Sequence, residues 1–345
     1  MSALAQTPSM RPRKWVSEQR SYTQEFLKSD DAREIALRVM YYQQKSGGWP
    51  KNIRYQEADE SLRFNKNELK YPDEATIDNG ATTSEIEFLS KMYGATGKKA
   101  YRKAALRGVE YILKAQYDNG GWPQYYPRTD AYHAAITYND DAMLNVLKLI
   151  ERIAKGEASF AYVGKSVRER CRKAFDKGIE CIINTQYVQN GVPTAWCAQH
   201  DQHTLQPCKA RAFELASLSG SESAGLVMFL MTIENPSDRL IQCIDHAAEW
   251  FRKVRITDLG FERFTDQQGR RDYRMVSKKG APDLWARFYT LGGNRPFFCD
   301  RDGVMKFDIS EIGHERRNGY SWYNTSGTKL LKMYDKWQKR VKCKK

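Results

Sequence analysis

An internal repeat constrains the fold of this chain more than any other feature of its sequence. Residues 101–123 read YRKAALRGVEYILKAQYDNGGWP, and residues 171–193, offset by 70, read CRKAFDKGIECIINTQYVQNGVP. A third, partial copy lies upstream, because QQKSGGWP at 43–50 matches the end of the first copy. Each copy combines an amphipathic helical pattern with a glycine–proline turn that ends it. The repeat therefore predicts a series of helix pairs.

Further helical patterns fill the segments between these copies. Thr82 and Glu85 form a capping-box pattern before one apolar run, and Asn139 is a plausible N-cap before the next. More helices are expected near 224–233, 241–254 and 328–341, with extended pieces only near 270–276. Repeats of this kind must stack or close to bury their apolar faces. We expect an all-α fold, a closed helical toroid whose long loops carry an active-site groove.

The positive charge of the chain is concentrated at its ends. The formal charge is 56 − 42 = +14, of which residues 1–20 contribute +3 and residues 328–345 contribute +7. We expect a basic N-terminal tail at 1–20 and one catalytic domain at 21–345 that ends in a basic helix or tail at 328–345. Such ends are usually solvated and only sometimes bind nucleic acid.

Several classes of protein are excluded by simpler counts. The longest apolar run, from Ala224 to Met231, has eight residues, whereas a membrane-spanning helix needs ~20. Seven cysteines at irregular spacing do not indicate a disulfide scaffold. The first residues have neither a basic nor an apolar region of a signal peptide.

Two acidic loops stand at helix starts. TIDNG occupies 76–80, and YNDD occupies 138–141. Carboxylates favour helix N-termini, so capping explains both loops without a ligand. Calcium binds about 6–8 oxygen ligands, and the two loops together would supply some of them. Capping and a calcium site both stay open on spacing alone.

Aromatic, cysteine and arginine residues give three further candidates. Trp49, Trp122 and Tyr125 follow the glycine turns and either fill gaps between helices or offer flat faces to sugar rings. The Cys-x2-His-x2-His-x4-Cys pattern at 197–208 is not a standard zinc finger. Guanidinium groups bind carboxylates through two hydrogen bonds, so four arginines are either anion-binding residues or surface ion pairs: Arg211, Arg287, Arg295 and Arg301.

Eight ordered motifs carry a family resemblance that covers roughly residues 40–331. They are GGWPKN, TIDNGATT, GGWPQYYP, ITYNDDAM, VPTAWCAQHD, KARAFELASLSG, LWARFYTLGGNRPFFCDRDG and ERRNGYSWY. In this order they resemble the family 10 polysaccharide lyases, which are pectate lyases. The resemblance implies an (α/α)3 toroid and calcium-assisted β-elimination of α-1,4-polygalacturonate to 4,5-unsaturated products. It also implies a secreted or periplasmic enzyme.

The resemblance assigns roles to individual residues. Arg301 corresponds to the catalytic base, and Arg211 and Arg287 to residues that hold substrate carboxylates. Asp78 and Asp140 correspond to calcium ligands, while Asn79, Trp122 and Tyr125 are expected at the substrate. The cysteine–histidine pattern falls in a stretch that binds no zinc in this family. We expect a monomer that acts on polygalacturonate and has no nucleic-acid or membrane partner.

The chemistry places a condition on the base. Elimination removes the proton at C5 of galacturonate, which requires a base there and cations at the adjacent carboxylate. Arginine is normally protonated, with a pKa above ~12. Because neighbouring positive charges disfavour the charged form and carboxylates favour it, we expect Asp300 and Asp302 to point away from the Arg301 guanidinium.

Two other functions remain as alternatives. An inverting glycoside hydrolase would use Asp78 and Asp140 as acid and base, with carboxyl groups ~6.5–9.5 Å apart. A non-catalytic binder of anionic polysaccharide would use the basic ends. Calcium dependence and an unsaturated product would distinguish the lyase from both.

Overall fold

The computed structural model describes residues 15–57, 73–128 and 130–342. The residues at 1–14 and 343–345, which belong to the two predicted tails, lie outside this description. The α-helices are α1 (Trp15–Ser21), α2 (Asp30–Tyr42), α3 (Thr83–Thr96), α4 (Lys99–Ala115), α5 (Ala142–Lys155), α6 (Lys165–Asn184), α7 (Glu222–Leu230), α8 (Asp238–Lys253), α9 (His314–Asn318) and α10 (Ser326–Lys342). Short 3-10 turns include η4 (Asp78–Gly80) and η6 (Asn139–Asp141).

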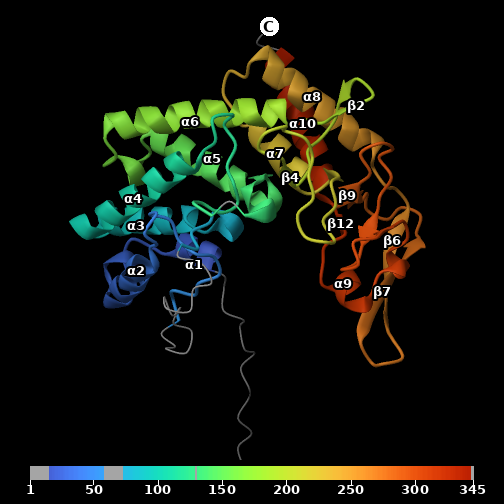
Figure 1. Ribbon diagram of the computed structural model, residues 1–345, viewed down its shortest axis with the longest axis horizontal. Helices are drawn as coiled ribbons and strands as arrows, with labels where there is room; N and C mark the ends of the chain where they lie inside the picture. Colours follow the sequence, from blue (N-terminus) through green and yellow to red (C-terminus); the bar gives the residue numbers. More distant parts are fainter. Residues whose placement is uncertain (1–14, 58–72, 129, 343–345) are drawn as a thin grey trace, which may run out of the picture.

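The helices form a series of stacked antiparallel pairs (Figure 1). α3 packs on α4, α5 on α6 and α7 on α8, and each pair also contacts the next pair. α5 illustrates why, because its apolar stripe is fully buried and its last turn carries basic residues before Gly156 ends it in the left-handed conformation. Burying each such side chain stabilises the fold by about 1.5–3 kcal/mol.

The repeat has a structural cause that the sequence shows only in part. Four tryptophans follow α2, α4, α6 and α8, and each indole N–H donates to a carbonyl of the helix before it. The donor–acceptor pairs are Trp49–Val39, Trp122–Ile112, Trp196–Ile182 and Trp285–Phe251, at 2.7–2.8 Å. The chain thus contains four copies of the unit, although only the first three share recognisable sequence.

A glutamine at the end of three of these helices ties each unit to the next one. Gln116 donates to the carbonyl of Gly120 in its own turn and to that of Ala174 in α6, at 3.0 and 2.8 Å. Gln43 and Gln186 make the equivalent pairs of hydrogen bonds. Each glutamine thereby ties the turn after its own helix to a carbonyl within the next helix of the series.

The prediction of an all-α fold is wrong. β6 (Leu259–Thr265) and β7 (Arg271–Ser277) form a seven-residue antiparallel hairpin. Shorter antiparallel pairs join β1 (Ile136–Thr137) to β4 (Gln199–His200), β2 (Val188–Gln189) to β3 (Val192–Pro193), β5 (Leu218–Ser219) to β9 (Phe288–Tyr289), β8 (Trp285–Ala286) to β12 (Tyr323–Asn324) and β10 (Phe298–Cys299) to β11 (Met305–Lys306). Long connections that fold back on one another can pair in this way without a visible strand pattern.

The closed toroid is also not what the described residues form. The helix pairs follow one another along an arc, with α1 and α2 at one end and α8 and α10 at the other (Figure 1). The residues beyond α8, together with Phe213 from the loop before α7, build a second hydrophobic cluster that includes Phe288, Phe298 and Trp322. α9 and the β6–β7 hairpin lie beside it. The loops therefore make a part of the molecule with its own core.

Both predicted capping arrangements differ from the structure. Thr82 has a φ of 63° and does not cap α3, because its hydroxyl accepts from Trp49 N–H and donates to Thr76 O. Glu85 is buried instead of closing a capping box. Asn139 lies inside η6, and Asp141 occupies the N-cap position of α5. No helix among the described residues has the length and hydropathy needed to cross a membrane.

Candidate active site

The two acidic loops lie against each other. η4 carries Asp78 and Asn79, η6 carries Asp140, and the two turns are in contact. Asn79 and Asp140 have φ angles of 52° and 51°, a left-handed conformation that Asn and Asp adopt more readily than most residues. Asp78 is buried, and Asp140 has its pKa raised, first by burial and then by the charge of Asp78. Two carboxylates of like charge therefore share a site.

A lysine completes this pair of loops. Lys51 Nζ forms an ion pair with Asp78, whose own amide is bonded to Thr76 Oγ1 at 3.0 Å. The ammonium also lies 5.8 Å from the centre of the Tyr125 ring, and Arg128 lies 5.1 Å from the same ring. Tyr125 is largely buried, and both cations lie near its ring.

Arg287 joins this acidic centre to the loop-built part of the molecule. Its guanidinium donates to Glu222 at 2.7 Å and to Asn139 at 3.2 Å, and it lies 4.5 Å from the ring centre of Tyr320. Arg287 and Glu222 have side-chain exposures of only 11% and 4%. Separating such a pair would leave a buried charge without its partner, which is costly. The ion pair with Glu222 therefore holds the Arg287 side chain in one position.

Arg211 lies next along the same chain of contacts. It donates from Nε to Glu214 at 2.7 Å, with a second bond from Nη2, and covers the Phe213 ring at 4.7 Å. Glu214 also accepts a hydrogen bond from Tyr320 Oη at 2.9 Å. Tyr320 therefore connects the two arginines that the sequence associates with substrate carboxylates.

Arg301 is exposed and pairs with a residue that the sequence did not indicate. Its guanidinium donates to both carboxylate oxygens of Glu315, at 3.3 and 3.2 Å. Asp300 and Asp302 point away, as expected, because Asp300 accepts from the amides of Arg301 and Gly313 and Asp302 accepts from that of Val304. Glu315 nevertheless supplies the carboxylate partner that those two aspartates do not.

The contacts connect Arg301 to the other arginines. Glu315 also accepts from Arg316 at 2.9 Å, and Arg316 lies 5.4 Å from the Tyr320 ring. Asp140 accepts a hydrogen bond from Asn139 at 2.8 Å, so one network of contacts runs from Asp140 and Asn139 through Arg287 and Tyr320 to Arg301. A cleft of about 620 Å³ lies beside the acidic end, lined by Asn79 and Asp140 among others.

Trp122 does not belong to this site, and its prediction as a sugar platform is wrong. Its side chain is fully buried, and its indole N–H is bonded to Ile112 O inside the helical core. Trp49 is buried in the same way, so it fills a gap between helices.

The cysteine–histidine pattern is structural. Both ring nitrogens of His200 are occupied, because Nε2 accepts from the Cys197 amide at 3.0 Å and Nδ1 bonds Leu205 O at 2.9 Å. Burial lowers the pKa of His200 to about 4, which keeps the ring neutral. The six cysteines among the described residues are free thiols.

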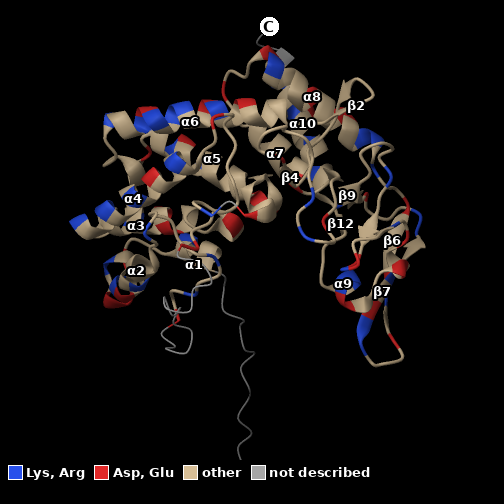
Figure 2. Cartoon of the chain, in the orientation of Figure 1, with Lys and Arg blue, Asp and Glu red and all other residues tan. Residues whose placement is uncertain are grey.

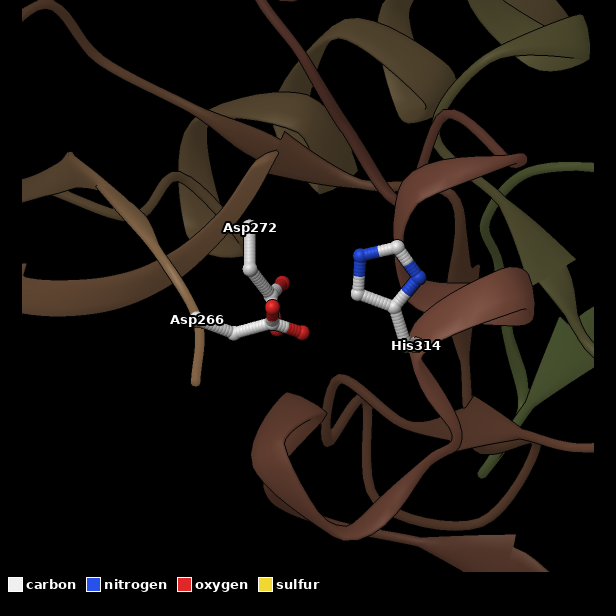
Figure 3. A group of neighbouring side chains, drawn as sticks. All are labelled: Asp266, Asp272 and His314. Carbon is white, nitrogen blue, oxygen red and sulfur yellow. The ribbon is translucent and has the colours of Figure 1, made fainter. Parts of the chain in front are cut away.

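A different acidic cluster lies where α9 meets the β6–β7 hairpin (Figure 3). Asp266, Asp272 and His314 bring ligand atoms within 4.8 Å of one another. Their charges are already matched, because Arg317 bonds both oxygens of Asp272 and Arg270 bonds Asp266 at 2.8 Å. The cluster is therefore an ion-pair network of the hairpin and not the calcium site expected at Asp78 and Asp140.

Comparison with known proteins decides the class of enzyme. Residues 43–331 match the family model described as pectic acid lyase. The chain belongs to the pectic acid lyase family. It is a polysaccharide lyase with pectate lyase activity, as its motifs indicated.

Two solved structures are similar in fold to this pectic acid lyase over almost its whole length. The family 10 polysaccharide lyase from Cellvibrio cellulosa is 34% identical, with a TM-score of 0.77 and coverage of 94% of this chain and 95% of that chain. A point mutant of that lyase in complex with trigalacturonic acid is also 34% identical, with a TM-score of 0.76 and coverage of 93% and 95%. No curated protein matches the chain.

Sequence reasoning missed several partners in the site of this pectate lyase. Lys51, Glu222, Tyr320 and Glu315 contact predicted site residues, yet none was singled out. Lys51, Tyr320 and Glu315 do stand inside the motifs GGWPKN and ERRNGYSWY. Placing each of them required knowing which distant loops meet.

Proposed function

We propose that this lyase cleaves α-1,4-polygalacturonate by calcium-assisted anti β-elimination, with Arg301 as the base that removes the C5 proton. The observation that carries the proposal is the network from Asp140 through Arg287 to Arg301. It connects the acidic residues that would hold calcium with arginines that would bind a substrate carboxylate and remove its proton. The trigalacturonic acid bound by a 34% identical lyase supports the substrate class.

Asp78 and Asp140 are the residues that would hold calcium. They fit such an ion because two carboxylates share one site, and burial together with the charge of Asp78 raises the pKa of Asp140. Bound calcium would stabilise negative charge that develops on a substrate carboxylate. Lys51 already neutralises part of the charge on Asp78.

The arginines have different tasks in this proposal. Arg287 is held rigidly by Glu222 and presents its remaining N–H groups to a carboxylate, and Arg211 extends the cationic surface beside it. Asn79 and Tyr125 contact the substrate from the acidic side. Because these groups are positioned before substrate arrives, they stabilise developing charge with little rearrangement.

Arg301 must lose its partner before it can act as a base. The Glu315 carboxylate favours the protonated guanidinium, in the same way that Asp300 or Asp302 would have done. Substrate binding has to replace this ion pair, and positive charge brought close to Arg301 in the complex would then disfavour its charged form. Activity should therefore rise with pH, since a higher pH populates the neutral base.

The test measures absorbance of the 4,5-unsaturated product from polygalacturonate at alkaline pH, with calcium and with chelator. Wild type is compared with Arg301→Ala and with Arg295→Ala, which removes an exposed arginine of the same segment that lies over Phe307 at 3.6 Å. We expect a calcium-dependent signal that Arg301→Ala abolishes and Arg295→Ala keeps. Reducing ends without absorbance would instead support hydrolysis through Asp78 and Asp140.

We also propose that residues 21–345 act as one catalytic domain, as a monomer and outside the cytoplasm. The family resemblance of the motifs is the support for the location. Gel filtration of the purified enzyme and fractionation of the producing cells would test these points.

A further inference from the structure

The basic C-terminal helix carries none of the residues that we assign to the cleavage site. α10 packs on α7 and α8, and one side of it is anchored in the core by Leu330, Tyr334 and Trp337. These residues are spaced four and three apart, so they form one stripe along the helix. The orientation of α10 is thereby fixed, and its opposite side is held towards solvent.

The solvent side carries a continuous row of cations. The exposed residues are Lys329, Lys332, Lys336, Lys339 and Arg340. At about 100° per residue these five side chains fall within a sector of about 100°, and the row is about 15 Å long. Neighbours three or four residues apart lie about 5–6 Å from each other. We call this surface the α10 lysine row.

The acidic residue of the helix does not neutralise the row. Asp335 lies at its edge and is bonded by Arg252 of α8 at 3.0 Å. Within the described part of the chain, none of the five cations has a carboxylate within 4.0 Å. By contrast, the exposed face of α6 mixes basic and acidic residues along its length (Figure 2).

We propose that the α10 lysine row is a second binding surface for polygalacturonate, separate from the cleavage site. The inference rests on the proposed substrate, a polymer with one carboxylate on every sugar. A straight row of unpaired cations complements an extended chain of such anions and also attracts it at a distance. In Figure 1, α10 runs away from α9, which holds Glu315 beside Arg301, so the row retains the polymer without entering the reaction.

Other polyanions fit this surface less well. A membrane-bound helix needs large apolar side chains on its exposed face, and those of α10 point into the core. Single-stranded nucleic acid is usually bound with aromatic side chains on which bases stack, and the lysine row has none.

The experiment replaces Lys329, Lys332, Lys336 and Lys339 by glutamine in the full chain. Its control changes Lys165, Arg172, Lys173 and Lys177 of α6 to glutamine, which removes the same charge from an exposed helix. Retardation in gels that contain polygalacturonate is measured in the cold, at slightly acidic pH and with chelator, so that little polymer is cut. Gels with DNA and anionic vesicles are run in parallel, and thermal unfolding checks the fold of each variant.

We expect the α10 variant to bind polygalacturonate about tenfold more weakly than the α6 control at low salt, with the difference shrinking as salt is added. Its turnover of trigalacturonate should equal that of wild type. Equal retardation of both variants, or a loss confined to DNA or vesicles, would overturn the proposal. If the fourfold variant does not fold, Lys332→Gln/Lys336→Gln gives the same comparison. Wild type that binds through α10 but yields no unsaturated product would instead contradict the proposed reaction.

Discussion

At the scale of single residues, the site is decided by which carboxylate meets which arginine. Arg287 is paired with a buried glutamate, whereas Arg301 is paired with an exposed one. A buried ion pair stays formed, because separating it would leave a buried charge without a partner. An exposed ion pair is screened by water, so its members exchange partners readily. This difference suits an arginine that only binds and another that must change its partner.

Replacing Glu315 by glutamine tests the exposed pair. Glutamine keeps the shape of the side chain but carries no charge to pair with the guanidinium, so the rise of activity with pH should begin at lower pH. Initial rates on polygalacturonate across a pH series measure the shift. Glu311→Gln, in the neighbouring turn, is the control and should leave the profile in place. A shift to higher pH would contradict the role of Arg301 as base.

Glu222→Gln tests the buried pair. It leaves the Arg287 charge buried without its partner, so we expect a loss of stability of about 3 kcal/mol or more and a strong loss of turnover. Urea unfolding and product absorbance measure the two effects. Arg211 has its own partner in Glu214 and should remain positioned, so the binding of short oligogalacturonates should fall only in part. Unchanged turnover would exclude Arg287 from the reaction.

At the scale of elements, the repeated turn depends on a close approach between neighbouring units. Gly120 has a φ of 92°, and a Cβ atom there would lie 2.1 Å from Lys177 O in α6. Gly191 has a similar φ of 80°, but a Cβ atom there would meet nothing within 4 Å. An alanine at Gly191 would therefore add backbone strain alone, whereas an alanine at Gly120 would add both backbone strain and steric overlap with α6.

We expect Gly120→Ala to cost much more stability than Gly191→Ala. Strain alone costs about 1–2 kcal/mol at a left-handed position, which is the expectation for Gly191→Ala. Gly120→Ala adds the overlap with α6, so its cost should exceed about 3 kcal/mol. Denaturant unfolding of both variants measures the two losses of stability. Equal losses would show that α6 can move away from the turn at Gly120 at little cost.

At the scale of the whole molecule, the sequence predicts the helical half better than the loop-built half. The helix pairs follow from the spacing of apolar residues and from the glycines and prolines that end each helix, which are local properties of the sequence. α5 and α8 accordingly end close to where the sequence predicts. The strand pairs and the open arc depend on contacts between residues far apart, such as Asn139 with Arg287 and Glu315 with Arg301. The motifs identify the arginines and aspartates of the site, but only the fold shows which side chains form ion pairs and hydrogen bonds with them.

The stability of the molecule should depend on pH through one buried carboxyl. Glu85 lies under α1, beside the cleft, and burial raises its pKa from 4.5 to about 8. Between these values the unfolded chain releases a proton that the folded chain keeps, so stability falls as pH rises from 4.5 to about 8 and then stays low. The full penalty is therefore present at the alkaline pH where the base is most active.

Glu85→Gln removes this dependence, because the amide does not titrate. The variant should gain stability relative to wild type as pH rises through this window, and the gain should level off above about 8. Thermal midpoints of both proteins below, within and above the window measure it, with Glu87→Gln, a partly exposed neighbour in α3 that pairs with Arg152, as the control. Since Glu85 contacts no reacting group in the proposed mechanism, the pH at which activity begins should not move, while the alkaline limit of activity should extend upward. A variant that loses stability equally at every pH would contradict this, because it would mean that the pKa of Glu85 is the same in the folded and unfolded chains.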